Sequence, residues 1–370
     1  MTTTFDPEQL QTALEAVHQA GVPGIVAEVR DRDHIWCGTA GVADTATDGP
    51  VTADMRFRVG SLTKTFTSAA ILRLVDDGAI GLDTPIGDYL PESVPGERGS
   101  AITVRMLISH TSGLHEYLPY AYSSLAAFPN VAQTTPDSLA DNRFTEFHAT
   151  DLIAMGVSAP ATGTPGGHPG VYSNTNYLLL GQLLESVTGI AAEKFITREI
   201  IERAGLRDTE FPSGTSITGP HALHYESWFG MFEPPRDFSV YNMSFVGPAA
   251  SLISTVSDLN HFYSLLLAGD IVSREALEQM QRTAPVVSFE GKLIDYGLGL
   301  QRTTLPDSGI HWGHEGSVWG AGAISLTSAD NTRQLTLAVN LQRWNRLDGS
   351  GRPQPHPIDE ALHTVIRLAL

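Results

Sequence analysis

Strand-forming segments are concentrated near the two ends of the chain, and helix-forming segments fill the stretch between them. Residues 24–44 combine two β-rich runs with a polar turn, which is typical of an antiparallel hairpin. A second pair of β-rich runs lies at 319–341, around the turn sequence SADNT. This distribution predicts an α/β (α+β) fold: an antiparallel sheet flanked by helices, built from both termini, with an inserted mainly helical domain.

The length of 370 residues is sufficient for about two domains. We assign residues 1–70 and 250–370 to the sheet domain and residues 71–249 to the mainly helical domain, with the active site in the cleft between them. Helices are also expected at both termini. Apolar periodicity predicts the helices between them at 61–78, 102–110, 145–156, 174–189 and 256–269.

The chain is strongly acidic, with 23 basic and 41 acidic residues and a formal net charge of -18. Such a charge repels nucleic acid and anionic membrane surfaces, so a small molecule or a short peptide is the expected partner. No apolar run reaches the roughly 18 residues of a membrane span, and the first residues lack the pattern of a signal peptide. A cytoplasmic location is therefore expected, with a removed secretion signal left open. The single cysteine, Cys37, is expected to be a buried thiol in a strand.

Ser61 and Lys64, in the sequence FRVGSLTKTF, lie one helical turn apart at the expected start of a helix near Leu62. A serine is a poor nucleophile at neutral pH, and a lysine can act as its base where burial lowers the pKa of the amine. The pair alone is weak evidence, because Ser61 could be a simple N-cap and Lys64 a surface side chain. Other motifs must support it.

Two such motifs follow. Tyr172 and Asn174 belong to the sequence YSN, which opens a predicted helix after a Gly/Pro-rich run. A tyrosine there can relay a proton from a lysine, and an ordinary half-buried tyrosine is the alternative. His314 and Gly316 belong to the sequence GHEG, expected just before a strand, where glycines would let a ligand approach the backbone. A structural histidine is the alternative there.

With these motifs in this order, the sequence resembles the penicillin-recognising serine hydrolases, a group that includes class C β-lactamases, D-Ala-D-Ala carboxypeptidases, D-aminopeptidases and D-amino acid amidases. The resemblance implies a β-lactamase/transpeptidase-like fold and a mechanism in which Ser61 attacks a carbonyl group to form an acyl-enzyme. Lys64 and Tyr172 would share the proton transfers. Asn174 would hydrogen-bond Lys64 or a substrate amide.

The resemblance also implies a role for the third motif. His314 belongs to the strand motif of the catalytic site, and the backbone N–H groups of Ser61 and Ser317 would form the oxyanion hole. This chemistry needs neither a metal ion nor an organic cofactor.

Specificity is expected to come from departures from the family pattern. In the carboxypeptidase branch the strand motif is usually His-Thr-Gly, and its threonine helps to hold the terminal carboxylate of the substrate; Glu315 occupies that position here. An arginine of the same branch corresponds to Gln301, with Arg302 beside it. Because like charges repel, Glu315 is expected to disfavour a free substrate carboxylate.

Further substrate-binding candidates lie in two other segments. Glu116, in HTSGLHEYLPY, resembles an acidic residue with which D-amino acid amidases hold the free α-amino group of the substrate. Trp228, in HYESWFGMF, is a candidate wall of a pocket for a large side chain, with packing in the core as the alternative. The complete set of predicted substrate-binding residues is Glu116, Trp228, Gln301, Glu315 and Gly316.

We therefore interpret the protein as a serine hydrolase, and specifically as a D-stereospecific amidase or aminopeptidase acting on D-amino acid amides, esters or short D-peptides. Four alternatives stay open: a D-Ala-D-Ala carboxypeptidase, a β-lactamase or esterase, a peptide-cyclising transferase, and a non-catalytic β-lactam-binding module. The intact Ser61, Lys64 and Tyr172 argue against the last of these.

Overall fold

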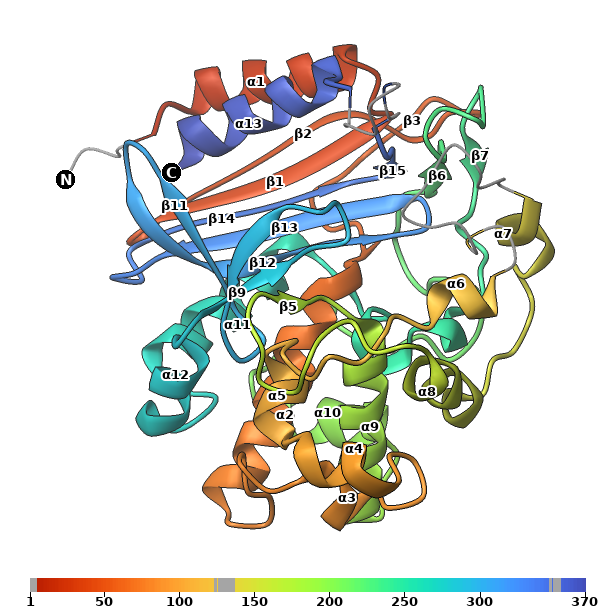
Figure 1. The fold of residues 1–370 in the computed structure, drawn as a ribbon. Helices are drawn as coiled ribbons and strands as arrows, with labels where there is room; N and C mark the ends of the chain where they lie inside the picture. Colours follow the sequence, from red (N-terminus) through yellow and green to blue (C-terminus); the bar gives the residue numbers. More distant parts are fainter. Residues whose placement is uncertain (1–4, 123–124, 126–136, 346–347, 349–353) are drawn as a thin grey trace.

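A large sheet with helices on both faces forms the centre of the molecule. The computed structural model describes residues 5–122, 125, 137–345, 348 and 354–370 (Figure 1). Figure 1 shows two terminal helices, α1 (Pro7–Gln19) and α13 (Pro357–Ala369), side by side on one face of this sheet. Most of the other helices lie below the opposite face. The predicted fold class, an antiparallel sheet flanked by helices and built from both termini, is confirmed.

The sheet has the strand order β3-β2-β1-β14-β13-β12-β11-β10-β9-β5. Its neighbouring strands are antiparallel, except for the parallel edge pair β5 and β9. The two ends of the chain meet where β1 pairs with β14. The strands are β1 (Gly24–Asp31), β2 (His34–Asp44), β3 (Gly49–Pro50), β5 (Gly170–Val171), β9 (Ala284–Val287), β10 (Leu293–Tyr296), β11 (Gln301–Leu305), β12 (Gly309–Val318), β13 (Ala321–Ser328) and β14 (Arg333–Val339).

The two predicted hairpins, β1–β2 and β13–β14, are confirmed. The strands β9 to β12 were not predicted, and the GHEG sequence lies inside β12 rather than before a strand. Two smaller sheets complete the strand inventory. One pairs β4 (Phe57–Arg58) with β8 (Ile253–Ser254), and the other joins β15 (Leu341–Gln342), β6 (Tyr225–Glu226) and β7 (Arg236–Asp237).

Helices form in all five predicted internal segments, and one of them, α8, extends two residues past its predicted end. They are α2 (Thr63–Asp76), α5 (Val104–Ile108), α8 (Ala149–Ser158), α9 (Asn174–Thr188) and α11 (Val256–Ala268). The shorter helical elements are α3 (Ile86–Tyr89), α4 (Gly96–Ala101), α6 (Leu118–Ala121), α7 (Asp137–Asp141), α10 (Ala192–Ile196), α12 (Arg274–Met280), the π-helical turn η4 (Thr197–Ile201), and the 3₁₀ turns η1 (Gly60–Leu62), η5 (Met243–Phe245) and η6 (Gly247–Ala249).

Local sequence sets the ends of the main helices. The Asp6 side chain accepts hydrogen bonds from the first backbone N–H groups of α1, and Ser173 and Thr255 cap α9 and α11 in the same way. Gly189 and Gly269 end α9 and α11 in the left-handed conformation that glycine adopts most easily. These caps fix where α9 begins, and hence where Asn174 lies.

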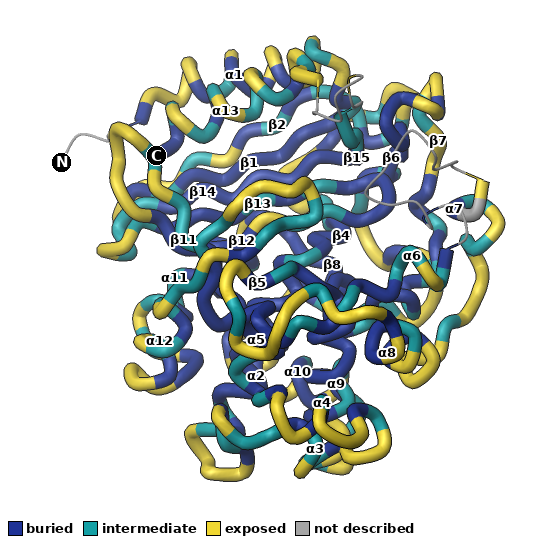
Figure 2. The backbone as a smooth tube through the Cα atoms, in the orientation of Figure 1, coloured by how far each residue is buried: buried dark blue, intermediate teal, exposed yellow. Residues whose placement is uncertain are grey.

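Two apolar cores lie on the two faces of the sheet. The larger core joins the sheet to α2, α9 and α11, with Phe66, Leu179 and Phe262 among its members. The second core lies between the other face and the helices α1 and α13. Figure 2 shows β1 and β14 buried and the outer sides of α1 and α13 exposed. Because sheet and helices share the larger core, the division at residues 70 and 250 stays a prediction.

One sequence expectation about the sheet is wrong. Cys37 lies in a strand, as predicted, but its side chain is exposed. The short strand β3 pairs with β2 only at Val42 and Asp44, so the part of β2 that holds Cys37 is a free edge. Within the part of the chain that the structure describes, no helix has both the length and the apolar character to cross a membrane.

Candidate active site

Ser61 lies at the junction of a short strand and a helix. The strand β4 leads into the 3₁₀ turn η1 and then into α2, so the helix predicted to begin near Leu62 starts with a tighter turn. Gly60 has a φ of 55°, a conformation that strains other residues. Arg58 is 1% exposed and donates hydrogen bonds to backbone carbonyl groups in the segment 215–241. These bonds anchor the strand that precedes Ser61.

Lys64 lies in the first turn of α2, and its side chain is completely buried. Its Nζ atom lies 3.0 Å from Ser61 Oγ, 2.7 Å from Asn174 Oδ1 and 2.9 Å from the carbonyl oxygen of Ala249. The surface lysine that the sequence left as an alternative is therefore ruled out. Lys64 instead joins three segments of the chain at one buried point.

The protonation of Lys64 decides what it can do. Burial lowers its pKa to about 7, against the opposing effect of the Glu116 carboxylate. At neutral pH, Lys64 is then a neutral amine in a substantial fraction of the protein molecules. The oxygens of Asn174 and Ala249 are hydrogen-bond acceptors, so they can take both N–H groups of this amine. Its lone pair is left to accept the hydrogen of the Ser61 hydroxyl group.

Tyr172 follows β5 and lies over the same point, with its ring centre 4.8 Å from Lys64 Nζ. Burial raises its pKa well above 10, the nearby Ser61 hydroxyl opposes this rise, and the carboxylates of Glu315 and Glu116 add to it. The phenol therefore keeps its proton at neutral pH. No described residue forms a hydrogen bond of standard geometry with its hydroxyl group, which is buried beside Ser61.

Glu116 is buried behind Asn174. Its carboxylate accepts hydrogen bonds from the backbone N–H groups of Asn174, at 2.6 Å, and Leu118, at 3.1 Å. The side chain is buried because these two donors draw it inward. Burial raises its pKa, while these bonds and the charge of Lys64 lower it.

The edge of β12 packs directly on the turn that carries Ser61. A Cβ atom on Gly316 would lie 2.1 Å from the carbonyl oxygen of Val59 and 2.7 Å from the backbone N of Ser61. A Cβ atom on Gly60 would lie 2.7 Å from the backbone N of Ser317. Glycine at both positions thus allows the two backbones to meet. The space that a side chain at Gly316 would fill is thus occupied by the backbone of residues 59–61, whereas the sequence suggested that a ligand would approach there.

Comparison with known families matches residues 10–355 to a family model described as Beta-lactamase. The chain belongs to the beta-lactamase family. The predicted family resemblance is confirmed, and with it the assignment of the protein as a serine hydrolase.

Three relatives of this beta-lactamase family member are informative. The solved structure of a D-stereospecific amidohydrolase from Streptomyces sp. is 34% identical, covers 90% of this chain and 94% of its own, and has a TM-score of 0.79. Penicillin-binding protein 4* of Bacillus subtilis is 25% identical over 346 residues, which are 90% of this chain and 71% of that protein. A D-aminopeptidase of Cereibacter sphaeroides is 25% identical over 340 residues, 91% of this chain and 60% of the relative.

His314 is completely surrounded by protein on the inner side of β12. Its Nδ1 lies against the carbonyl oxygen of Glu315, so this nitrogen carries the ring hydrogen and Nε2 accepts the bond from the Tyr296 hydroxyl group, 3.0 Å away. Burial and the charge of Lys64 lower the pKa of His314 to about 3. The ring is therefore neutral, and both of its nitrogens are engaged within the protein.

Sequence reasoning did not identify the aromatic side chains around this histidine. Tyr296 lies 3.3 Å from the hydroxyl of Tyr177, which in turn lies 3.0 Å from Ser68 Oγ. His110 stacks on Tyr172, with ring centres 4.0 Å apart. His110 lies in the sequence ISHTSGL, Tyr296 in the sequence YGLGLQR and Tyr177 in the helix after YSN. Their contacts could not be predicted from helical spacing or turn sequences, because each contact joins segments that are far apart in the sequence.

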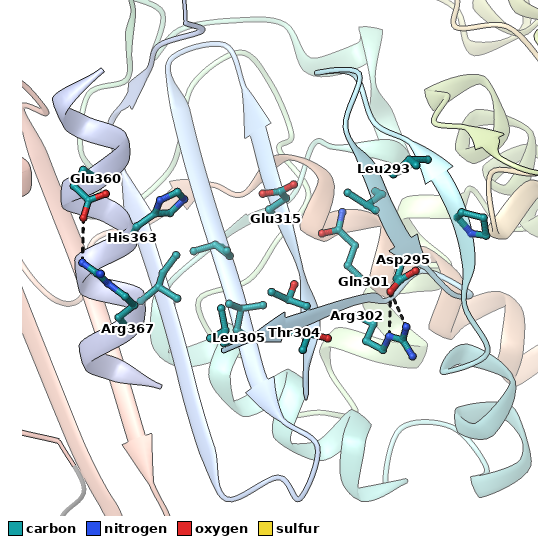
Figure 3. A pocket seen from close by; sticks show the side chains of 16 residues that line it. Leu293, Asp295, Gln301, Arg302, Thr304, Leu305, Glu315, Glu360, His363 and Arg367 are labelled. Carbon is teal, nitrogen blue, oxygen red and sulfur yellow. Dashed lines mark hydrogen bonds and ion pairs between the residues drawn. The ribbon is translucent and has the colours of Figure 1, made fainter. Parts of the chain in front are cut away.

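The positions of Gln301 and Glu315 correct the sequence argument about substrate carboxylates. In the register of β12 and β13, Glu315 is opposite Ile324, on the face of the sheet that α13 covers, whereas His314 and Gly316 lie on the other face. Figure 3 shows Gln301 and Glu315 in a cavity of about 790 Å³, with Glu360, His363 and Arg367 of α13 across from them. They do not share the face of Ser61.

Arg302, next to Gln301, already has an ion-pair partner. Arg302 forms an ion pair with Asp295, with 2.7 Å between Nη2 and the carboxylate oxygen. It therefore does not present a free guanidinium group in this structure.

Trp228 packs in an aromatic core rather than lining an open pocket. The side chain is 1% exposed, and its ring centre lies 5.7 Å from that of Trp319 and 5.0 Å from that of Phe229. The core-packing alternative is therefore correct, because neighbouring aromatic rings cover the indole. In the described parts of the chain, no group of three or more His, Cys, Asp or Glu side chains could hold a metal ion.

Proposed function

We propose that the protein hydrolyses D-amino acid amides, and related esters and short peptides with an N-terminal D-residue, through an acyl-enzyme on Ser61. The observation that carries this proposal is the contact between Ser61 Oγ and the buried Lys64 amine, at 3.0 Å. Its lowered pKa makes Lys64 a base that functions near neutral pH. A half-buried serine and a buried lysine with a merely structural role would not require this arrangement.

The first step follows from the hydrogen bonds of Lys64. The neutral amine takes the proton of Ser61 as its oxygen attacks the substrate carbonyl carbon. The resulting ammonium ion remains hydrogen-bonded to Asn174 and Ala249, which stabilise its charge in a buried place. Both acceptors are therefore positioned before the reaction begins.

The oxyanion of the tetrahedral intermediate would lie between the backbone N–H groups of Ser61 and Ser317. These two segments are in contact through Gly60 and Gly316. Removing one donor from such a pair typically costs about 10²–10³ in rate. Tyr172, which keeps its phenolic proton, is suited to pass a proton to the leaving amine, and Lys64 can replace that proton.

The charges near the site favour a substrate with an amine and no free acid. His314 is neutral and has no ring nitrogen left to bind a carboxylate. Lys292, just before β10, and Arg302, in β11, are paired with Glu290 and Asp295. These two described cations are therefore already paired and are not free to bind a terminal carboxylate.

Glu116 supports the amine part of the proposal. Its two oxygens each accept one backbone hydrogen bond, and a carboxylate can accept about four, so unused acceptor positions remain. Its negative charge acts on Lys64 and would also attract an ammonium group bound at the site. The D-stereospecific amidohydrolase, 34% identical over most of both chains, supports the choice of amide substrates and of D-stereochemistry.

A D-Ala-D-Ala carboxypeptidase or penicillin-binding activity is the second candidate, favoured by the relationship to penicillin-binding protein 4*.

The proposed hydrolysis of D-amino acid amides is tested by measuring ammonia release from D-phenylalaninamide and L-phenylalaninamide, with Ser61→Ala as the blank. Release from the D-amide alone, together with a covalent acyl adduct on Ser61 in mass spectra, is expected. Equal release from both enantiomers, or release by Ser61→Ala, would rule the proposal out.

A further inference from the structure

A second buried carboxylate lies outside the residues assigned so far. Glu226, in β6, is 0% exposed. Its Oε1 accepts a hydrogen bond from the backbone N–H of Trp228 at 2.8 Å, and its Oε2 accepts one from the backbone N–H of Gly320 at 2.9 Å. Burial raises the pKa of Glu226 to about 8, while these bonds and one from the Ser227 backbone oppose the rise. Both oxygens of the group therefore act as acceptors for backbone N–H groups of the described chain.

The two segments held by Glu226 are both tight turns. Trp228 and Phe229 have φ values of 41° and 55°, which cost energy for residues with side chains. Gly320 has a φ of 82° in the two-residue turn between β12 and β13. A Cβ atom there would lie 2.7 Å from the carbonyl carbon of His224. The segment 224–228 therefore lies directly against the tip of this hairpin.

The hairpin tip is continuous with the site. Three residues before Gly320 comes Ser317, whose backbone N lies beside Gly60. Trp319, also in the tip, packs on Trp228 and stacks on Phe245, with ring centres 5.7 Å and 5.6 Å apart. The position of this hairpin therefore sets the distance between the backbones of β12 and η1.

We propose that Glu226 is a positioning residue for the reaction at Ser61: by binding the backbone of Gly320 and of Trp228, it holds the β12–β13 hairpin so that the N–H of Ser317 points to the oxyanion. This inference rests on the proposed acyl-enzyme chemistry. It does not depend on the identity of the substrate. The effect is expected on the tetrahedral intermediate and not on the binding of the uncharged ground state.

The test compares Glu226→Gln with the wild-type protein. The amide can still accept one backbone hydrogen bond, but its NH₂ group faces the other donor, so the hairpin loses one anchor. The probe is phenylboronic acid, which forms a tetrahedral adduct with a serine oxygen. We expect its affinity, and kcat for D-phenylalaninamide, to fall about tenfold or more. KM should change by less than about twofold, because ground-state contacts are unaltered.

The matched control is Glu28→Gln. Glu28 is a buried carboxylate in β1 that contacts Arg30 and Asn260, away from the hairpin. This variant should lower the melting temperature without changing boronate affinity. If Glu226→Gln folds and keeps wild-type boronate affinity and kcat, or if Glu28→Gln loses boronate affinity equally, the inference is wrong.

A second variant keeps the inference testable if Glu226→Gln fails to fold. Glu226→Asp retains the charge but is too short to reach both N–H groups, so it should show the same loss of boronate affinity with KM maintained; a wild-type affinity would contradict the inference. Failure of the proposed function is distinguishable. In that case the wild-type protein binds the boronate but releases no ammonia from D-phenylalaninamide, and the Glu226 variants still lose boronate affinity.

Discussion

At the scale of single residues, burial gives Lys64 its chemistry. An exposed lysine is almost fully protonated at neutral pH, whereas this side chain is surrounded by protein and has a pKa lowered to about 7. The same burial keeps Tyr172 protonated and His314 neutral. Lys64 can thus act as a base, Tyr172 as an acid and His314 as an uncharged partner. The sequence motifs identified these residues, but they could not predict their protonation states.

The pH dependence of acylation tests this account of Lys64. Since the neutral amine is the active form and its pKa is about 7, kcat/KM should increase with pH through about 7 and fall roughly tenfold per pH unit below it. Initial rates with D-phenylalaninamide from pH 5 to 9 measure this. A profile that keeps increasing toward pH 10, as for an exposed lysine, would contradict the lowered pKa of Lys64.

The contact between Gly316 and η1 gives a second prediction. Gly316→Ala forces a methyl group to within 2.7 Å of the Ser61 backbone N, so we expect kcat to fall about a hundredfold and stability to decrease by about 1–3 kcal/mol. Gly214→Ala is the control, since nothing lies within 4 Å of its added methyl group. Rates and thermal unfolding are compared. Full activity in Gly316→Ala would show that the two backbones are not held together.

At the scale of helices and strands, local sequence patterns predicted the elements that depend mainly on local sequence. Caps and apolar periodicity identified α1, α9 and α11, and turn sequences identified the hairpins β1–β2 and β13–β14. The strands β9 to β12 escaped prediction because β9 and β10 are short and β12 is interrupted by glycines. For the same reason the face of Glu315 could not be predicted, since it depends on the register of β12 with β13.

That register leads to a prediction about Glu315. Because its side chain lies on the α13 side of β12, a threonine hydroxyl there could not reach a substrate bound beside Ser61. Glu315→Thr should therefore change the ratio of N-acyl-D-Ala-D-Ala turnover to D-phenylalaninamide turnover by less than about threefold, the size of a solvated charge effect. Competition assays measure this ratio. A tenfold gain for the acidic substrate would return Glu315 to the substrate site.

At the scale of the whole molecule, the site joins segments that are far apart in the sequence: 57–66, 116, 172–174 and 314–317. The three motifs could be recognised because each is short and local. Their mutual geometry depends on a shared core between the sheet and the helices, and on buried titratable groups that this core holds uncharged. Catalytic activity and global stability should therefore respond to pH through different groups.

The stability prediction concerns His224, which stacks on Phe57. Burial lowers its pKa well below 6.5, and neither ring nitrogen bonds a described residue. As the pH falls, His224 therefore binds a proton in the unfolded chain at a higher pH than in the folded protein. Its contribution to stability is complete above about pH 6.5 and is lost as the pH falls below that value. His224→Phe should reduce this loss by up to about 1.4 kcal/mol per pH unit below 6.5. Urea unfolding at pH 7 and pH 5 measures the free energy of unfolding of both proteins. The same loss of free energy between these pH values in wild type and variant would contradict the prediction.

The measurement that tests the central claim most directly is a side-by-side turnover assay of D-phenylalaninamide and an N-acylated D-Ala-D-Ala peptide, with Ser61→Ala as the blank. A site that has an ionisable Glu116, a neutral His314 and an Arg302 already paired with Asp295 predicts release of ammonia from the amide and little release of D-alanine. Release of D-alanine in preference to ammonia would show that the site accepts a terminal acid and would contradict the account.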